Sequence, residues 1–243
     1  MHVSYDKVDL SHVAQMHYFF DSAFPAGSYG HSFGFETFAT SKLGGDRGQA
    51  LEWIRNYMVF SLWYGDLENI SKARTYLEQS PTRSLEGDIL VTLDKRLHAT
   101  RSTIEARRSA RSLASSLKAA ASRLFADKVG DGVELPSLDF DSRTFLEPST
   151  FVALLSHDLG WDEDYTKLLY IQGQALLATS VLIRCGKIGQ FSQLEMMAEL
   201  IDLSAKLASA RPSELQRRGA VTAWAIEVDQ INHQNLSPRL FQS

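Results

Sequence analysis

The chain has 243 residues, of which 44% are hydrophobic and 22% are charged, and its formal net charge at pH 7 is -4. This composition is that of an ordinary globular protein with enough apolar residues to bury a sizeable core. The slightly acidic balance argues against general nucleic-acid binding, which depends on many Lys and Arg side chains that neutralise phosphates.

Helical periodicity begins near Leu51 and recurs through the first half of the chain. Apolar side chains follow one another at intervals of three and four residues, which is the spacing of one face of an amphipathic helix. The last of three such segments is also rich in alanine, the strongest helix former. The three stripes are Leu51, Ile54, Met58 and Leu62; Leu85, Ile89, Leu93 and Leu97; and Leu113, Leu117 and Leu124.

Capping residues predict where the later helices begin. Ser149 is a candidate N-cap for one helix, and Asp162 is a candidate N-cap for a second, longer one. Ser192 and Glu195 have the spacing of a capping box, which predicts the start of a third helix. A last helix is expected over residues 216–233.

Strand signals are sparse, because β-branched residues are too few to build a sheet. Residues 127–148 are rich in glycine, proline and aspartate, which predicts one long exposed loop. The segment does not have the composition of a linker between two domains. We therefore predict an all-α fold, a single-domain helical bundle of roughly eight to ten helices. The domain would span residues 1–243, with a mobile C-terminal tail at 234–243.

Signals for export or for a membrane are absent from the sequence. The first residues carry neither a basic segment nor an apolar run, and no stretch approaches the roughly 18 to 20 apolar residues that span a bilayer. Cys185 is the only cysteine and can form no internal disulfide, which fits a reducing compartment. We expect a cytoplasmic protein that does not enter the membrane.

A short pattern suggests one enzymatic alternative. Residues 30–34 read Gly-His-Ser-Phe-Gly and match the G-x-S-x-G of a nucleophile elbow, with Ser32 as the nucleophile. His233 with Asp229 or Asp202 would complete a triad. An elbow follows a buried parallel strand, yet a proline and two glycines interrupt the residues before this one. A serine hydrolase is therefore a minor alternative.

Potential metal ligands are scattered along the sequence. His31 and Glu36 lie five positions apart, so they would not share one face of a helix. Cys185 has no neighbouring cysteine, and we interpret it as a small buried side chain. We expect no metal site and no catalytic residues in this chain.

Basic side chains gather in one region. Arg101, Arg108 and Arg111 can line up on one face of a helix, and such a stripe can meet an acidic partner. A solvated helix surface is the simpler interpretation, and it is the one we adopt.

Residues 25–36, Pro-Ala-Gly-Ser-Tyr-Gly-His-Ser-Phe-Gly-Phe-Glu, closely resemble the motif P-x-G-x-x-x-H-S-x-G-x-E of the urease accessory protein F family. The preceding Phe-Asp-Ser-Ala-Phe at 20–24 is also typical of that family. Weaker resemblance continues at 188–190, Ile-Gly-Gln, and at 239–243, Arg-Leu-Phe-Gln-Ser, which is similar to the family's R-L-F-x-S terminus. Two departures are Gln234, where many relatives have glutamate, and the absence of an expected glycine around 106–117.

The resemblance implies an all-α, non-enzymatic homodimer. It implies binding to a D-type urease accessory protein and to a nickel-carrying GTPase during maturation of the urease apoprotein, with regulation of GTP hydrolysis left open. Nickel and GTP would be handled by these partners, so no cofactor is bound directly. A helical interaction module unrelated to urease is the other alternative. The implied partner-binding residues are Pro25, Gly27, His31, Ser32, Gly34, Glu36, His233, Arg239, Leu240 and Phe241.

Two further expectations concern Glu36 in the motif and the C-terminal tail. We expect Glu36 to be a surface charge whose replacement leaves the fold intact. An alternative interpretation makes the motif a helix start, with Ser28 or Ser32 as its cap and Phe35 and Phe38 in the core. We expect the C-terminal tail to be mobile alone and to become ordered against the D-type partner.

Overall fold

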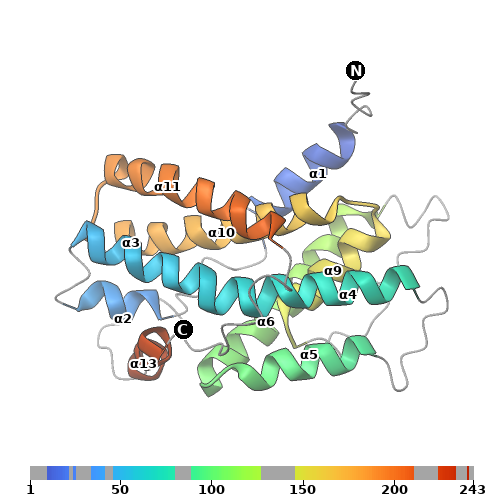
Figure 1. The fold of residues 1–243 in the computed structure, drawn as a ribbon, viewed down its shortest axis with the longest axis horizontal. Helices are drawn as coiled ribbons and strands as arrows, with labels where there is room; N and C mark the ends of the chain where they lie inside the picture. The colour runs from blue at the N-terminus through green and yellow to red at the C-terminus, as the bar shows by residue number, and fades with distance from the viewer. Residues whose placement is uncertain are drawn as a thin grey trace.

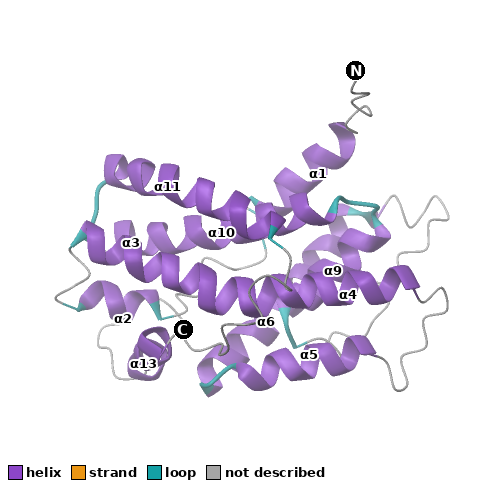
Figure 2. Ribbon diagram, in the orientation of Figure 1, coloured by secondary structure: helices purple, strands orange, loops and turns teal. Residues whose placement is uncertain are grey.

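The computed structural model of the chain describes residues 10–21, 24–25, 34–41, 46–79, 89–126, 146–210, 224–233 and 240. Within these ranges every regular element is a helix and no strand occurs, which confirms the predicted all-α fold (Figure 2). The described elements are α1 (Leu10–Phe20), α2 (Phe35–Thr40), α3 (Arg47–Asn56), η3 (Tyr57–Leu67), α4 (Glu68–Gln79), α5 (Ile89–Thr100), α6 (Ile104–Leu124), α9 (Pro148–Asp158), α10 (Glu163–Arg184), α11 (Gln190–Ser209) and α13 (Trp224–Asn232).

The helices α3, η3 and α4 form one continuous helical run that other helices of the bundle contact. Its three segments follow one another without a break over residues 47–79. In Figure 1, α10 and α11 lie above this run and α5 lies below it, and all three helices contact it. The middle segment, η3, is a π-helix. Most π-helical segments in proteins are only a single turn long. The predicted stripe is confirmed as buried: Leu51, Ile54, Met58 and Leu62.

Helices α10 and α11 pack together as an antiparallel pair (Figure 1). Asp162 is the N-cap of α10, as predicted, and its side chain accepts a hydrogen bond from the Tyr165 amide at 2.7 Å. Gly186 follows α10 with φ 68, a left-handed conformation that glycine adopts without a steric penalty. The chain can therefore reverse direction within a few residues and return as α11.

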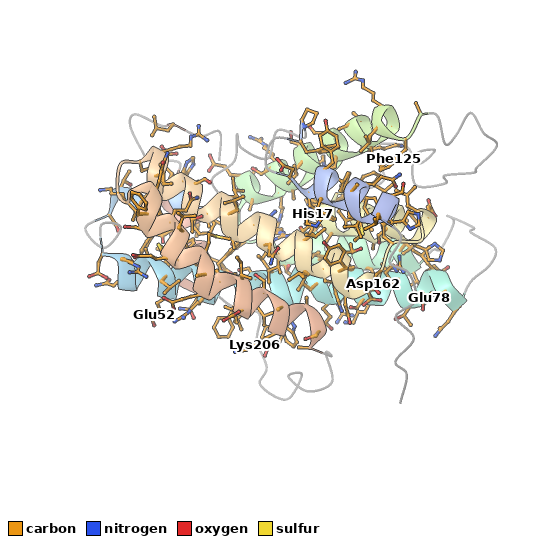
Figure 3. The ribbon with its side chains drawn as sticks, turned by 90° about the horizontal axis from the view of Figure 1, so that it is seen from above. His17, Glu52, Glu78, Phe125, Asp162 and Lys206 are labelled. Carbon is orange, nitrogen blue, oxygen red and sulfur yellow. The ribbon has the colours of Figure 1, made fainter. Side chains whose placement is uncertain are left out.

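An aromatic cluster joins α1 to the start of α10. Phe19 of α1 packs edge-on against Trp161 with ring centroids 5.7 Å apart, and Phe125 contacts the same indole at 6.0 Å. Trp161 is fully buried between them. At the surface, His17 and Tyr165 are hydrogen-bonded, so α1 lies against the first turn of α10, near Asp162 in Figure 3. Aromatic burial of this kind contributes strongly to stability.

The predicted start of α9 is wrong. This helix begins at Pro148 with Glu147 as its N-cap, so Ser149 lies inside the first turn and is buried. Proline is favoured at this position because the amide hydrogen that it lacks would have no partner within the helix. Ser149, the residue after this proline, therefore has no capping role.

The predicted capping box of α11 is also wrong. The helix begins at Gln190 after Gly189, which makes no side-chain cap, and Ser192 and Glu195 lie inside the helix. Glu195 instead pairs with Arg47 of α3 at 2.8 Å. The final helix is described only from residue 224, and the earlier residues of its predicted range lie outside the described part of the chain.

No helix in the described ranges combines the length and the apolar character that a membrane span requires. The single domain over residues 1–243 and the mobile tail at 234–243 stay predictions.

Candidate functional site

Of the motif at 25–36, the structure describes Pro25 and the residues from Gly34 onward, where the chain enters α2. Gly34 has φ 89, a left-handed conformation that any residue with a Cβ atom disfavours. Gly34 itself is the N-cap of α2 and makes no side-chain cap hydrogen bond, so neither Ser28 nor Ser32 holds the N-cap position that the helix-start interpretation gave them. Phe35 and Phe38 are buried, as the helix-start interpretation predicted.

Glu36 is buried rather than exposed, and its side chain is only 1% accessible. The prediction of a surface charge is therefore wrong. Its carboxylate Oε2 accepts a hydrogen bond from His233 Nε2 at 2.9 Å, and its Oε1 accepts one from the backbone amide of Leu240 at 2.6 Å. Buried carboxylates need such donors, because loss of hydration is otherwise uncompensated. The motif glutamate thus binds two residues from the other end of the chain.

His233 connects this contact to α6. Its Nδ1 lies 3.5 Å from Glu105 Oε2, within ion-pair distance but without hydrogen-bonding geometry. Glu105 stands in the first turn of α6, after the N-cap Thr103, whose side chain accepts from the Ala106 amide at 2.9 Å. Only the doubly protonated imidazole ring carries an N–H toward both carboxylates. The ends of α2, α6 and α13 therefore meet at one histidine.

Leu240 presents its side chain outward although its amide is held by Glu36. The residue is 57% exposed, while its backbone amide is bound to a buried carboxylate. Pro25 is exposed as well. We name Glu36, His233 and Leu240 the clasp. The other predicted partner-binding residues lie outside the described part of the chain: Gly27, His31, Ser32, Arg239 and Phe241.

A second polar cluster lies deep in the bundle and was not predicted. Arg101 Nη2 is 3.1 Å from Asp66 Oδ1 and 2.8 Å from Glu147 Oε2, and both carboxylates are almost fully buried. His98 Nδ1 lies 2.8 Å from the other oxygen of Glu147. Tyr170 donates its hydroxyl to Asp66 at 3.0 Å. This cluster ties η3, α9 and α10 to the segment before α6.

The position of Arg101 corrects the predicted basic stripe. The residue precedes α6 and turns inward, so it does not share an exposed face with Arg108 and Arg111, which are exposed as expected. Burial would by itself lower the pKa of Arg101, but Asp66 and Glu147 raise it well above its ordinary value. The guanidinium therefore stays charged.

Asp94 of α5 holds the segment that leads into α9. Its two carboxylate oxygens accept hydrogen bonds from the amides of Leu146 at 2.8 Å and Glu147 at 3.1 Å. The side chain is fully buried, and this burial raises its pKa from 3.8 to about 6. The two amide hydrogen bonds act in the opposite direction.

The sequence held one signal for the polar cluster. Asp66 is the only charged residue in the apolar run over 57–67. A charge in the middle of such a run must find a partner when the helix is buried. Its partners Arg101 and Glu147 lie far along the chain, and no local spacing identifies them.

The described residues do not assemble a hydrolase site. His233 directs Nε2 to Glu36 and is almost fully buried. Asp229 accepts a hydrogen bond from Trp53 Nε1 at 3.0 Å, and Asp202 is exposed on α11. Neither aspartate orients the imidazole as a catalytic triad requires.

Among the residues that the structure describes, no three histidine, cysteine, aspartate or glutamate side chains are grouped as a metal site would need. Cys185 packs partly buried against the core. Burial, and then the negative charge of Glu36, raise the pKa of its thiol. A thiol that stays protonated is a poor nucleophile and a poor metal ligand.

Two comparisons with known proteins agree with each other. The family model described as UreF matches residues 45–201. The urease accessory protein UreF of Lachnoclostridium phytofermentans is 24% identical over 231 residues, which cover 92% of this chain and 95% of the relative. The matched range of the family model contains neither the motif at 25–36 nor the C-terminal segment. It therefore supports the resemblance independently of those two segments.

Proposed function

The chain belongs to the UreF family, and we propose from this premise that it is a non-catalytic accessory protein of urease maturation. It acts as a homodimeric scaffold that bridges a D-type urease accessory protein and a nickel-carrying GTPase, for delivery of nickel to the urease apoprotein. Nickel and GTP bind to the partners and not to this chain. Whether the scaffold also regulates GTP hydrolysis is decided by comparing the GTPase rate with and without it.

The observation that carries this proposal is the clasp. The family motif and the C-terminal segment lie at opposite ends of the sequence, yet Glu36 of the first binds Leu240 of the second. A site built from both segments supports a common role for them. The outward leucine side chain gives this site an apolar group that a partner can cover, and full burial of a leucine is worth about 1.5 to 3 kcal/mol.

The test is co-purification of the protein with the D-type accessory protein and the GTPase after co-expression. We expect all three to elute as one complex. Leu240→Ala should weaken binding of the D-type protein about tenfold or more, since each factor of ten corresponds to about 1.4 kcal/mol. Leu194→Ala is the matched control, because Leu194 is 66% exposed on α11, a helix at the opposite edge of the bundle from α13 (Figure 1). Failure of the unmodified protein to bind either partner would refute the proposal.

A further inference from the structure

We infer that the exposed face at the start of α6 binds an acidic segment of the D-type accessory protein. This face consists of Ile104, Arg107, Arg108 and Arg111, and we name it the α6 face. The inference rests on the proposed function for the identity of the partner. It concerns a different surface from the exposed leucine of the clasp, and it is argued from different observations.

The fold turns the α6 face away from the bundle. Its four residues are three or four positions apart, so they share one side of the helix. The opposite side is buried and carries Ala106, Ala110 and Leu113, among others. Ile104 is 64% exposed, and the three arginines are exposed as well. Arginine is enriched in protein interfaces and in their hot spots, and the isoleucine adds an apolar group that a partner can bury.

The positive charge of the α6 face is not neutralised within the described part of the chain. Arg108 and Arg111 form no ion pair with any described residue. Arg107 donates its Nε to the backbone carbonyl of Arg101 at 2.8 Å, a contact that orients the guanidinium without cancelling its charge. Three cationic groups thus stand together on a chain whose net charge is -4.

This arrangement opposes the stability of α6 itself. Arg107 and Arg111 are four positions apart and Arg108 and Arg111 are three apart, and like charges at these spacings repel each other on a helix. Arg107 also lies at the end of the first turn, where the helix dipole disfavours positive charge. Sequence spacing alone favours a solvated surface here. Unpaired charges that lower stability without a structural gain indicate instead a surface kept for binding, because an acidic partner would relieve the repulsion.

The position of the α6 face favours a partner that also binds at the clasp. Glu105, which follows Ile104, lies 3.5 Å from His233, so the face begins where α6 approaches the end of α13 (Figure 1). A protein that covers the clasp can extend onto the first turns of α6. Nucleic acid is disfavoured, because the net charge of the chain is negative and phosphates gain nothing from the isoleucine.

The experiment compares two charge-reversal variants of the full-length protein. Arg108→Glu combined with Arg111→Glu reverses the α6 face and leaves the bonded Arg107 in place. Lys95→Glu combined with Lys206→Glu reverses the same number of exposed charges on α5 and α11 and is the control. Affinity for the D-type protein and for the GTPase is measured by biolayer interferometry at low and at physiological ionic strength. The melting temperature of each isolated variant is measured in parallel, and an unstructured RNA oligonucleotide serves as a nonspecific polyanion.

We expect the reversed α6 face to weaken binding of the D-type protein about tenfold or more at low ionic strength, and less at physiological ionic strength, because salt screens the lost attraction. The melting temperature should not fall, since the substitutions remove like-charge repulsion. The control should bind the D-type protein as the unmodified protein does. If the reversed variant does not fold, Arg108→Gln combined with Arg111→Gln replaces it, with weaker but still salt-dependent loss of binding expected.

Four outcomes would overturn the inference while the proposed function stands. They are D-type binding unchanged by the reversal, equal losses in the control, a loss of GTPase binding in place of D-type binding, and RNA binding by the unmodified protein as tight as D-type binding. Absence of any D-type binding by the unmodified protein would refute the proposed function and the inference together.

Discussion

His233 and Glu36 form a buried pair across 197 positions of the chain, with Nε2 and Oε2 2.9 Å apart and both side chains 1% exposed. Removing one partner of a buried hydrogen bond leaves the other unsatisfied, which typically destabilises a protein by about 1 to 3 kcal/mol, and by more when the remaining group is charged. We therefore expect His233→Ala and Glu36→Ala each to lower the free energy of unfolding by several kcal/mol, measured by urea denaturation. Glu52→Ala, an exposed glutamate on α3, is the control and should change it by about 0.5 kcal/mol at most.

The double variant tests whether the pair acts as a unit. Its loss should be smaller than the sum of the single losses, because the second substitution removes a group that is already unpaired. Additive losses would show that the two side chains contribute separately and would contradict the pairing.

Gly34 and Gly189 offer a matched comparison, because both are N-caps without a side-chain cap. Gly34 has φ 89, whereas Gly189 has φ -92, a value that any residue adopts. Gly34→Ala should therefore lower the free energy of unfolding by about 1 to 2 kcal/mol. Gly189→Ala should change it little, since a Cβ there meets no atom within 4 Å. Thermal unfolding of the two variants side by side checks the difference. Equal losses would mean that the positive φ at Gly34 does not determine the cost of the substitution.

Sequence patterns predicted the helices better than the site, for a physical reason. The spacing of Leu51, Ile54 and Met58 records which face of a helix is buried, and an N-cap such as Asp162 acts on amides within one turn. Both are local relationships. The start of α9 is set by Pro148, whose preference for the first helical position is also local and outweighs the capping preference of Ser149.

The clasp and the polar cluster depend instead on tertiary packing. No residue near Glu36 in the sequence indicates that His233 and Leu240 are its partners, so the local pattern predicts a surface charge where the fold buries one. The one usable sign was that Phe35 and Phe38 flank it, because a short helix with buried residues on both sides leaves little room for an exposed carboxylate. The same reason applies to Arg101, because its partners come from η3 and from the N-cap of α9, far from it in the sequence.

Asp94 predicts a pH dependence of stability. Burial raises the pKa of Asp94 to about 6 in the folded protein, while the unfolded chain has the ordinary value near 3.8. Between these values the folded state binds the proton and the unfolded state does not, so this residue's contribution to stability falls as pH rises from about 4 to 6. The slope is at most about 1.4 kcal/mol per pH unit.

Asp94→Asn isolates this contribution, because asparagine keeps an acceptor oxygen but does not titrate. The difference in free energy of unfolding between the unmodified protein and the variant should fall across pH 4 to 6 and stay constant above pH 7. Urea denaturation at each pH measures it. A difference that is flat from pH 4 to 7 would show that Asp94 titrates normally.

Arg101 lies between two buried carboxylates, and its removal is expected to be the more damaging of two arginine substitutions. Arg101→Met keeps much of the side-chain volume but leaves Asp66 and Glu147 without the guanidinium that neutralises both, so we expect a loss of about 3 to 5 kcal/mol. Arg108→Met, on the exposed face of α6, should cost about 0.5 kcal/mol or less.

Adding Asp66→Asn and Glu147→Gln to Arg101→Met should restore part of the stability, since neutral amides do not repel each other and are less costly to bury than unpaired carboxylates. Arg101→Lys should be less stable than the unmodified protein, because one ammonium group lacks the planar guanidinium that reaches both carboxylates. Chemical denaturation of the four proteins tests this order, and equal losses for Arg101→Met and Arg108→Met would show that the buried cluster contributes no more than a surface charge.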